Sequence, residues 1–177
     1  MKVSKYLTYE EATKSQTALR KGISNDPNEE QLERMKYVAV NVFDKVREFV
    51  GGSLHASSFF RSEALNAAIG GSSTTSQHMK GEAIDIDCDT FGNGTNNQVF
   101  DFIKDTLEFD QVIGEYPDAS GKWSWVHVSL KKSGNRKQVL VKLKDKYIPY
   151  DQFKVGMVWT LQRNNYIVWM KTTHAKP

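Results

Sequence analysis

The stretch Ser76-Gln77-His78-Met79-Lys80-Gly81-Glu82-Ala83-Ile84-Asp85-Ile86-Asp87 decides the fold and the chemistry that this sequence predicts. It begins as a polar loop carrying His78 and continues, after a glycine, as an alternating segment over residues 83–88. Such alternation is typical of a strand with one buried apolar face. Asp85 and Asp87 are therefore expected on the open face, where a carboxylate and an imidazole can bind a divalent metal.

A second segment, Trp123-Ser124-Trp125-Val126-His127-Val128-Ser129, supplies another imidazole. Its alternation predicts a strand on which Trp123, Trp125 and His127 share one face. Together with the first histidine and aspartate, His127 would complete a set of two imidazoles and one carboxylate. Such a set suits Zn²⁺, and three protein ligands leave a fourth position for water, which is the pattern of a catalytic zinc site.

The motifs Ser-x-His-x-x-x-x-x-x-Asp and Trp-Val-His-Val-Ser resemble those of peptidase M15, the zinc D-Ala-D-Ala carboxypeptidase and murein endopeptidase family. The likeness extends upstream to Ser58-Phe59-Phe60-Arg61-Ser62-Glu63-Ala64-Leu65-Asn66 and to Gly70-Gly71-Ser72. It also includes the opening Tyr9-Glu10-Glu11-Ala12-Thr13-Lys14-Ser15 and the turn Gly22-Ile23-Ser24-Asn25. The resemblance covers residues 6–143.

The resemblance implies a single zinc site whose ligands are His78, Asp85 and His127. It implies that Arg61 contacts the substrate, either stabilising the developing oxyanion or holding a substrate carboxylate. Ser76 fits the serine of the Ser-x-His motif and would lie beside the substrate. The implied substrate is a peptidoglycan stem peptide, cut at a D-Ala-D-Ala or an L-Ala-D-Glu bond.

The general base departs from the family pattern. Many members carry Glu or Asp three residues before the last histidine ligand, where this sequence has Ser124. Glu115 is a substitute: in a hairpin with its turn near residues 118–121, Glu115 lies opposite Ser124 or Trp125 and shares that residue's face. The stretch Gln111-Val112-Ile113-Gly114-Glu115 also resembles a Q-x-I-x-E stretch found in some branches of the family. We therefore expect Glu115 to be the base.

Two further side chains each have two interpretations. Trp125 would contact substrate from the wall of the cleft, or it would simply pack on the sheet. Asp87 would orient His78 from behind, or it would be a solvated or capping carboxylate.

The rest of the chain predicts an α+β fold in which helices of the N-terminal half pack on an antiparallel sheet that carries the metal site. Residues 1–143 would form the peptidase domain. Residues 144–177 would form an aromatic, basic, β-prone extension packed on the same domain. The expected helices begin near residues 8, 28, 62 and 96, the first reaching residue 20 and the second residue 51; the expected strands are 54–60, 83–88, 110–115, 123–130 and 137–143.

The composition is that of an ordinary globular protein, with 39% hydrophobic and 25% charged residues. A net charge of +3 is too small to indicate nucleic-acid binding, and no segment is apolar enough for membrane insertion. Cys88 is the single cysteine, so no internal disulfide is expected. We expect a monomer.

No apolar stretch of signal-peptide length follows Met1. We therefore expect a protein made in the cytoplasm that acts on the cell wall after release, as phage endolysins do. The leading hypothesis is a zinc-dependent peptidoglycan peptidase. The alternative is a zinc-containing module of the same fold that binds cell wall or signals without hydrolysis, and Ser124 keeps that alternative open.

Overall fold

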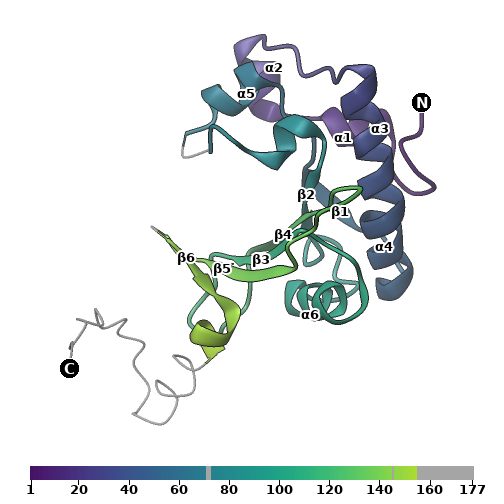
Figure 1. Ribbon diagram of the computed structural model, residues 1–177. Helices are drawn as coiled ribbons and strands as arrows, with labels where there is room; N and C mark the ends of the chain where they lie inside the picture. The colour runs from purple at the N-terminus through teal and green to yellow at the C-terminus, as the bar shows by residue number, and fades with distance from the viewer. Residues whose placement is uncertain (71–72, 145, 155–177) are drawn as a thin grey trace.

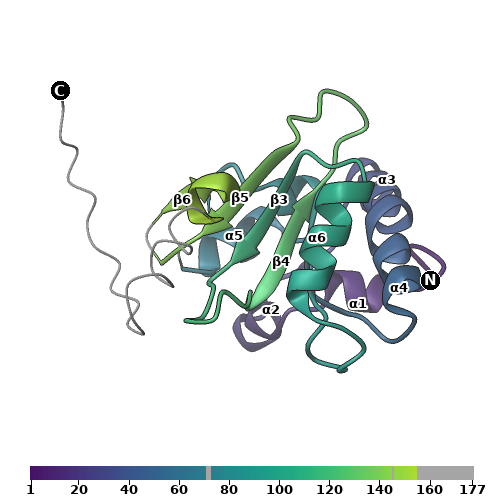
Figure 2. The same cartoon turned by 90° about the horizontal axis from the view of Figure 1, so that it is seen from below.

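The computed structural model of the 177-residue chain describes residues 1–70, 73–144 and 146–154 (Figures 1 and 2). These residues form an α+β fold around a six-stranded sheet with the strand order β1-β2-β4-β3-β5-β6. The strands are β1 His55–Ser58, β2 Ala83–Asp87, β3 Gln111–Glu115, β4 Trp125–Ser129, β5 Gln138–Lys142 and β6 Tyr147–Pro149. The helices are α1 Tyr9–Thr13, α2 Gln16–Lys21, α3 Glu29–Val38, η1 Ala39–Phe43, α4 Asp44–Val50, α5 Glu63–Ala68, η2 Gln77–Lys80 and α6 Asn96–Thr106.

The sheet is mixed, so the expectation of an antiparallel sheet is wrong for one pair of strands. β5 runs parallel to β3, with Gln111 opposite Gln138 and Glu115 opposite Lys142. The reason is the short connection over residues 130–137, which crosses the start of β3 and begins β5 on its far side. Asp110, which directly precedes β3, binds Arg136 of this connection and so holds the crossing in place.

One long helical segment lies against the sheet and ends as expected at Gly51. It runs through α3, the π-helical turn η1 and α4, and Asn28 caps its start with a hydrogen bond to the backbone N–H of Gln31. Gly51 ends it in the left-handed conformation, with φ of 68°. The middle of its apolar stripe is fully buried, with Met35, Val38, Val42 and Val46 in the core, whereas Phe49 near its end is exposed.

The first helix is shorter than expected, because Ser15 divides it. Ser15 has extended backbone, and its hydroxyl accepts from the N–H of Ala18 to start a new helix, α2. Helices α3, α4 and α6 cover the apolar face of the sheet, whereas α2 and α5 lie away from them, on the side of the opposite face (Figure 1). The opposite face of the sheet is therefore free to carry polar side chains.

The described residues between 146 and 154 add to the same sheet and core. Strand β6 pairs with β5, and Phe153 is buried in the main hydrophobic core. Trp159, Tyr166 and Trp169, which the sequence analysis assigned to the aromatic extension, lie outside the described residues. Within the described ranges, no helix has the length and apolar character needed to cross a bilayer.

Candidate metal centre

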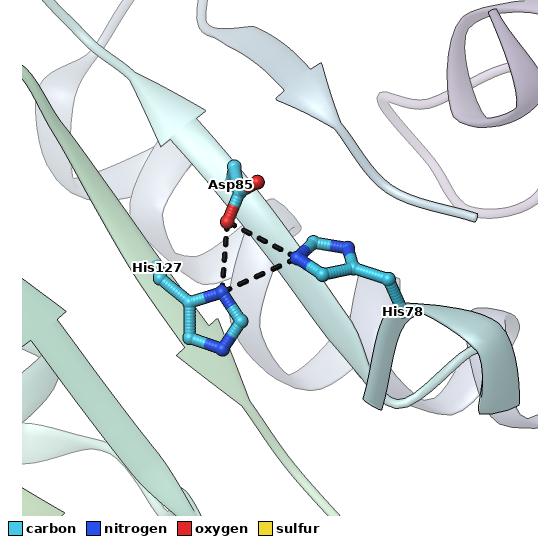
Figure 3. Close-up of side chains that lie close together, drawn as sticks. All are labelled: His78, Asp85 and His127. Atoms are coloured by element: carbon cyan, nitrogen blue, oxygen red, sulfur yellow. Dashed lines mark hydrogen bonds and ion pairs between the residues drawn. The ribbon is translucent and has the colours of Figure 1, made fainter. Parts of the chain in front are cut away.

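Three side chains from three elements converge on the open face of the sheet (Figure 3). His78 comes from η2, Asp85 from the middle of β2 and His127 from the middle of β4. The register of the β2–β4 ladder places Asp85 directly opposite His127, so their side chains emerge on the same face. The short helix η2, which directly precedes β2, carries His78 next to these two side chains.

The spacing of the three donor atoms fits a zinc ion. Asp85 Oδ1 lies 2.8 Å from His127 Nδ1 and 3.3 Å from His78 Nε2, and the two imidazole nitrogens are 3.3 Å apart. Tetrahedral zinc with bonds of about 2.0–2.1 Å requires ligand atoms about 3.3 Å apart. Two imidazoles and a carboxylate are also a donor set that zinc prefers. His78, Asp85 and His127 would therefore hold zinc with little rearrangement.

His78 is held in the tautomer that a metal ligand needs. Its side chain is buried, and Nδ1 donates a hydrogen bond to the carbonyl oxygen of Phe59 at 2.6 Å. A carbonyl can only accept, so the proton is on Nδ1 and the lone pair of Nε2 points at the site. Burial lowers the pKa of His78, which keeps the imidazole neutral and able to bind a cation.

Asp85 remains ionised although it is buried. Burial acts to raise the pKa of its carboxyl, but the neighbouring His78 and His127 outweigh burial and hold the pKa well below its ordinary value. The second carboxylate oxygen, Oδ2, accepts a hydrogen bond from Arg61 Nη2 at 2.8 Å. The site thus contains a permanently negative ligand, oriented by a guanidinium.

Glu115 lies on the same face of the sheet as His127. It is two residues along β3 from Ile113, which pairs with His127. Across the β3–β4 hairpin, Glu115 pairs with Trp125, which is one of the two partners inferred from the sequence. Burial, and then the negative charge of Asp85, raise the pKa of Glu115 to about 7. A carboxyl whose pKa is near neutrality can both accept and donate a proton under physiological conditions.

All these groups line one open cleft of about 1200 Å³. Arg61, Ser76 and Trp125 also line it, and their contact with substrate stays a prediction. The ring of Trp125 packs against Tyr116, with ring centroids 5.1 Å apart. The cleft is large enough for an extended peptide.

One expectation about a neighbouring residue is wrong, and the two roles considered for Asp87 are reduced to one. Trp123 does not share the face of His127: it is buried in the core against Phe100, because β4 begins only at Trp125 and strict alternation does not extend upstream. Asp87 does not orient His78; its carboxylate instead accepts from the backbone N–H of Asp89 and the amide of Asn96.

Ser124 also turns away from the site. Its hydroxyl donates to the carbonyl oxygen of Tyr116, and it is not among the residues that line the cleft. Its role is to close the hairpin, for which its backbone N–H also binds the carbonyl oxygen of Glu115.

The sequence analysis missed Lys142 and Tyr147, which form the wall of the cleft beyond Glu115. They lie on β5 and β6, whose place in the sheet depends on the parallel pairing of β5 with β3. The alternation of Gln138, Leu140 and Lys142 was a signal for one shared face, but only the strand order shows that this face is the cleft.

Two imidazoles and one carboxylate lie in an open cleft of this α+β fold, beside a carboxyl whose pKa is near neutrality. This combination is typical of metallopeptidases. The family comparison is more specific. The sequence model described as Peptidase M15 matches residues 5–129. The chain therefore belongs to peptidase family M15, whose members are generally zinc-dependent. A comparison with curated proteins found no match.

Proposed function

We propose that this protein is a zinc metallopeptidase that hydrolyses peptide bonds in peptidoglycan stem peptides. The observation that carries the proposal is the position of Glu115 on the same face as His78, Asp85 and His127, in one cleft. Membership of peptidase family M15 supports a substrate of the peptidoglycan type.

Zinc, when bound, would lower the pKa of a water molecule and polarise the scissile carbonyl. Glu115 would accept a proton from the attacking water as its oxygen bonds to the carbonyl carbon. It would then donate this proton to the amide nitrogen as the C–N bond breaks, which releases a carboxylate and an amine. The raised pKa of Glu115 suits both steps.

Arg61 has hydrogen-bonding capacity left for substrate. Its Nε donates to Ser58 Oγ at 2.9 Å and its Nη2 to Asp85 Oδ2, which ties the guanidinium to β1 and β2. Three of the five N–H groups of an arginine remain available after these two bonds. Since Arg61 lines the cleft, these groups would stabilise the negative charge on the carbonyl oxygen in the transition state.

The alternative is a zinc-containing module that binds cell wall without hydrolysis. The absence of a carboxylate at Ser124 favours it, whereas the raised pKa and cleft position of Glu115 favour an enzyme. The two functions differ in their products. A binding module would sediment with purified peptidoglycan and release nothing.

The test is incubation of the zinc-loaded protein with purified peptidoglycan, followed by mass spectrometry of the soluble fragments. Release of D-alanine would identify a carboxypeptidase, and new D-Glu amino termini would identify an endopeptidase. The Glu115→Gln protein is the matched control, because it keeps the metal ligands. Sedimentation of the wild-type protein with the wall but without products would contradict the hydrolase and favour the binding module.

A further inference from the structure

One row of side chains crosses the cleft next to the metal ligands. Strand pairing places Trp125 opposite Glu115, Glu115 opposite Lys142, and Lys142 opposite Tyr147, on the four successive strands β4, β3, β5 and β6. Paired residues share a face of the sheet, and all four line the cleft. Lys142 is therefore the neighbour of Glu115 on the side away from Trp125.

Lys142 differs from Arg61, Lys131 and Arg136 in making no ion pair among the described residues, although its charge acts on the facing carboxyl of Glu115. The cleft-lining cations are Lys14, Arg61, Lys80, Lys131, Arg136 and Lys142. Arg61 is paired with Asp85, while Lys131 and Arg136 are both paired with Asp110. Within the described part of the chain, Lys142 makes no ion pair. Its ammonium instead lies 4.0 Å from the centre of the Tyr147 ring.

The contact with Tyr147 gives the ammonium a fixed position without neutralising it. A lysine over an aromatic face is held by about 0.5–1 kcal/mol at an exposed site, and it keeps its full charge. Tyr147 comes from the C-terminal segment, beyond residues 5–129 that match the family. The ring and the ammonium thus form a small cationic subsite on the Glu115 side of the cleft.

We propose that Lys142, positioned by Tyr147, binds the free α-carboxylate of the amino acid whose nitrogen leaves. This inference rests on the proposed function, in which Glu115 donates a proton to that nitrogen. The α-carboxylate is attached to the same carbon as the leaving nitrogen, so it must lie within a few ångströms of Glu115. Neighbouring strands are about 4.8 Å apart, so the backbone of Lys142 lies beside that of Glu115 and its side chain emerges next to the Glu115 side chain on the same face.

Stem peptides offer such a carboxylate at either of the two bonds considered. Cleavage of D-Ala-D-Ala releases a terminal D-alanine with its free carboxylate. Cleavage of L-Ala-D-Glu releases a D-glutamate that continues through its γ-carboxyl, so its α-carboxylate is also free. An internal bond of an ordinary protein has a neutral amide at this position. The subsite would therefore favour stem peptides over protein chains at either bond.

Binding measurements test the subsite independently of turnover. The probes are the pentapeptide L-Ala-γ-D-Glu-L-Lys-D-Ala-D-Ala and two derivatives, amidated either at the C-terminus or at the D-Glu α-carboxylate. Each is titrated calorimetrically into the zinc-loaded Glu115→Gln protein. We expect one of the two amidations to weaken binding about tenfold, the effect of losing one charged contact. Adding Lys142→Met should remove this difference, since methionine keeps the length of the side chain but not its charge.

Three further variants test whether the discrimination depends on Lys142 and Tyr147 rather than on any positive charge in the cleft. Lys80→Met removes another unpaired cleft cation and should leave the tenfold discrimination intact. Tyr147→Phe keeps the ring and should preserve discrimination, whereas Tyr147→Leu should reduce it. The wild-type enzyme should cut the bond next to the carboxylate whose amidation weakens binding, as mass spectrometry of the products will show.

Equal binding of the acid and both amides would overturn the proposal, as would discrimination that survives Lys142→Met. Loss of discrimination in Lys80→Met to the same extent would overturn it too. The proposed function can fail separately. Acid-selective binding that depends on Lys142, without hydrolysis by the wild-type protein, would keep the subsite and contradict the peptidase. Hydrolysis without such selectivity would support the peptidase and contradict the subsite.

Discussion

Arg61 and Asp85 form an ion pair that gives the two carboxylate oxygens of the aspartate different partners. Oδ2 of Asp85 lies 2.8 Å from Arg61 Nη2, while Oδ1 lies 2.8 Å from His127 Nδ1 and faces the metal site. The pair is nearly buried, with side-chain exposures of 16% for Arg61 and 9% for Asp85. The arginine therefore fixes the plane of the carboxylate and presents a single oxygen to the metal.

Replacing Arg61 should weaken zinc binding, although Arg61 is not itself a ligand. Loss of a residue that orients a metal ligand typically costs about 10-fold to 100-fold in affinity or activity. We expect a loss of this order for Arg61→Ala, measured by competition with a chromogenic chelator. Arg47→Ala, which removes an arginine of α4 that lies over the Tyr6 ring and does not line the cleft, should leave affinity unchanged. Unchanged affinity in Arg61→Ala would show that the ion pair does not orient Asp85.

The purified protein should bind about one zinc ion per chain, and removal of any ligand should abolish stoichiometric binding. The variants are His78→Ala, Asp85→Ala and His127→Ala, and the measurement is metal content after dialysis. His55→Ala is the matched control, because His55 also lines the cleft but lies outside the triad. Stoichiometric zinc in the His127→Ala protein would contradict the assignment.

Glu115→Gln should reduce turnover without loss of zinc. General-base catalysis is typically worth about 100-fold to 10,000-fold, and glutamine keeps the size of the side chain while removing the base. The decrease should be in kcat, with little change in peptide binding. Ser124→Ala should have a much smaller effect, because the Ser124 hydroxyl is turned away from the cleft. Wild-type turnover in Glu115→Gln would direct attention to Glu82, which also lines the cleft.

The pKa of Glu115 makes the stability of the metal-free protein depend on pH. Folding raises this pKa from 4.5 to about 7, so the native state binds the proton more tightly than the unfolded state. The resulting stabilisation is complete below pH 4.5 and is lost as the pH rises through 7. A shift of this size corresponds to at most about 3 kcal/mol.

Urea unfolding of metal-free wild type and metal-free Glu115→Gln, at pH 5 and at pH 8, measures this effect. We expect wild type to lose stability relative to Glu115→Gln between these two values. The comparison cancels the opposite contribution of His78, whose lowered pKa destabilises the native state at low pH in both proteins. A constant difference between the two proteins would show that Glu115 ionises normally.

The crossing between β4 and β5 should depend on Asp110. This carboxylate is fully buried; although burial acts to raise its pKa, hydrogen bonds from Arg136 and Lys131 hold the pKa well below its ordinary value. Arg136→Ala should cost about 1.5–3 kcal/mol in the free energy of unfolding, the range for hydrogen bonds to a charged group. Lys137→Ala, which breaks an exposed pair with Glu108, should cost less than about 1 kcal/mol.

The contribution of Asp110 should be present above pH 3.8, its ordinary pKa, and should be lost progressively as the pH falls below that value. Equal costs for Arg136→Ala and Lys137→Ala in chemical denaturation would show that the buried carboxylate does not anchor the crossing.

The elements that carry the metal ligands could be predicted because each depends on local pattern. Alternation around Asp85 indicated a strand with an open polar face, and the hairpin indicated Ser124 or Trp125 as the partner of Glu115, of which the structure has Trp125. Both inferences use neighbours in sequence or a single tight turn, where periodicity determines which side chains share a face.

What the sequence did not show depends on contacts between distant segments. The parallel pairing of β5 depends on the crossing of residues 130–137, which the ion pair of Asp110 with Arg136 holds in place and which periodicity does not reveal. Trp123 was misplaced because its ring packs over Gly114, where any larger residue would meet that ring: a Cβ there would lie 2.5 Å from it. The glycine and the tryptophan are a matched pair that only the assembled hairpin identifies.

The position of β4 between β2 and β3 has a consequence for how the protein folds. β2 and β3 precede β4 in the chain, yet β4 separates them in the sheet, so these two earlier strands cannot complete their ladders until β4 inserts between them. Chain emerging from a ribosome therefore lacks a metal site until residue 129 is available. Only then can Asp85 and His127 meet, so the metal site forms only after β4 has joined the sheet.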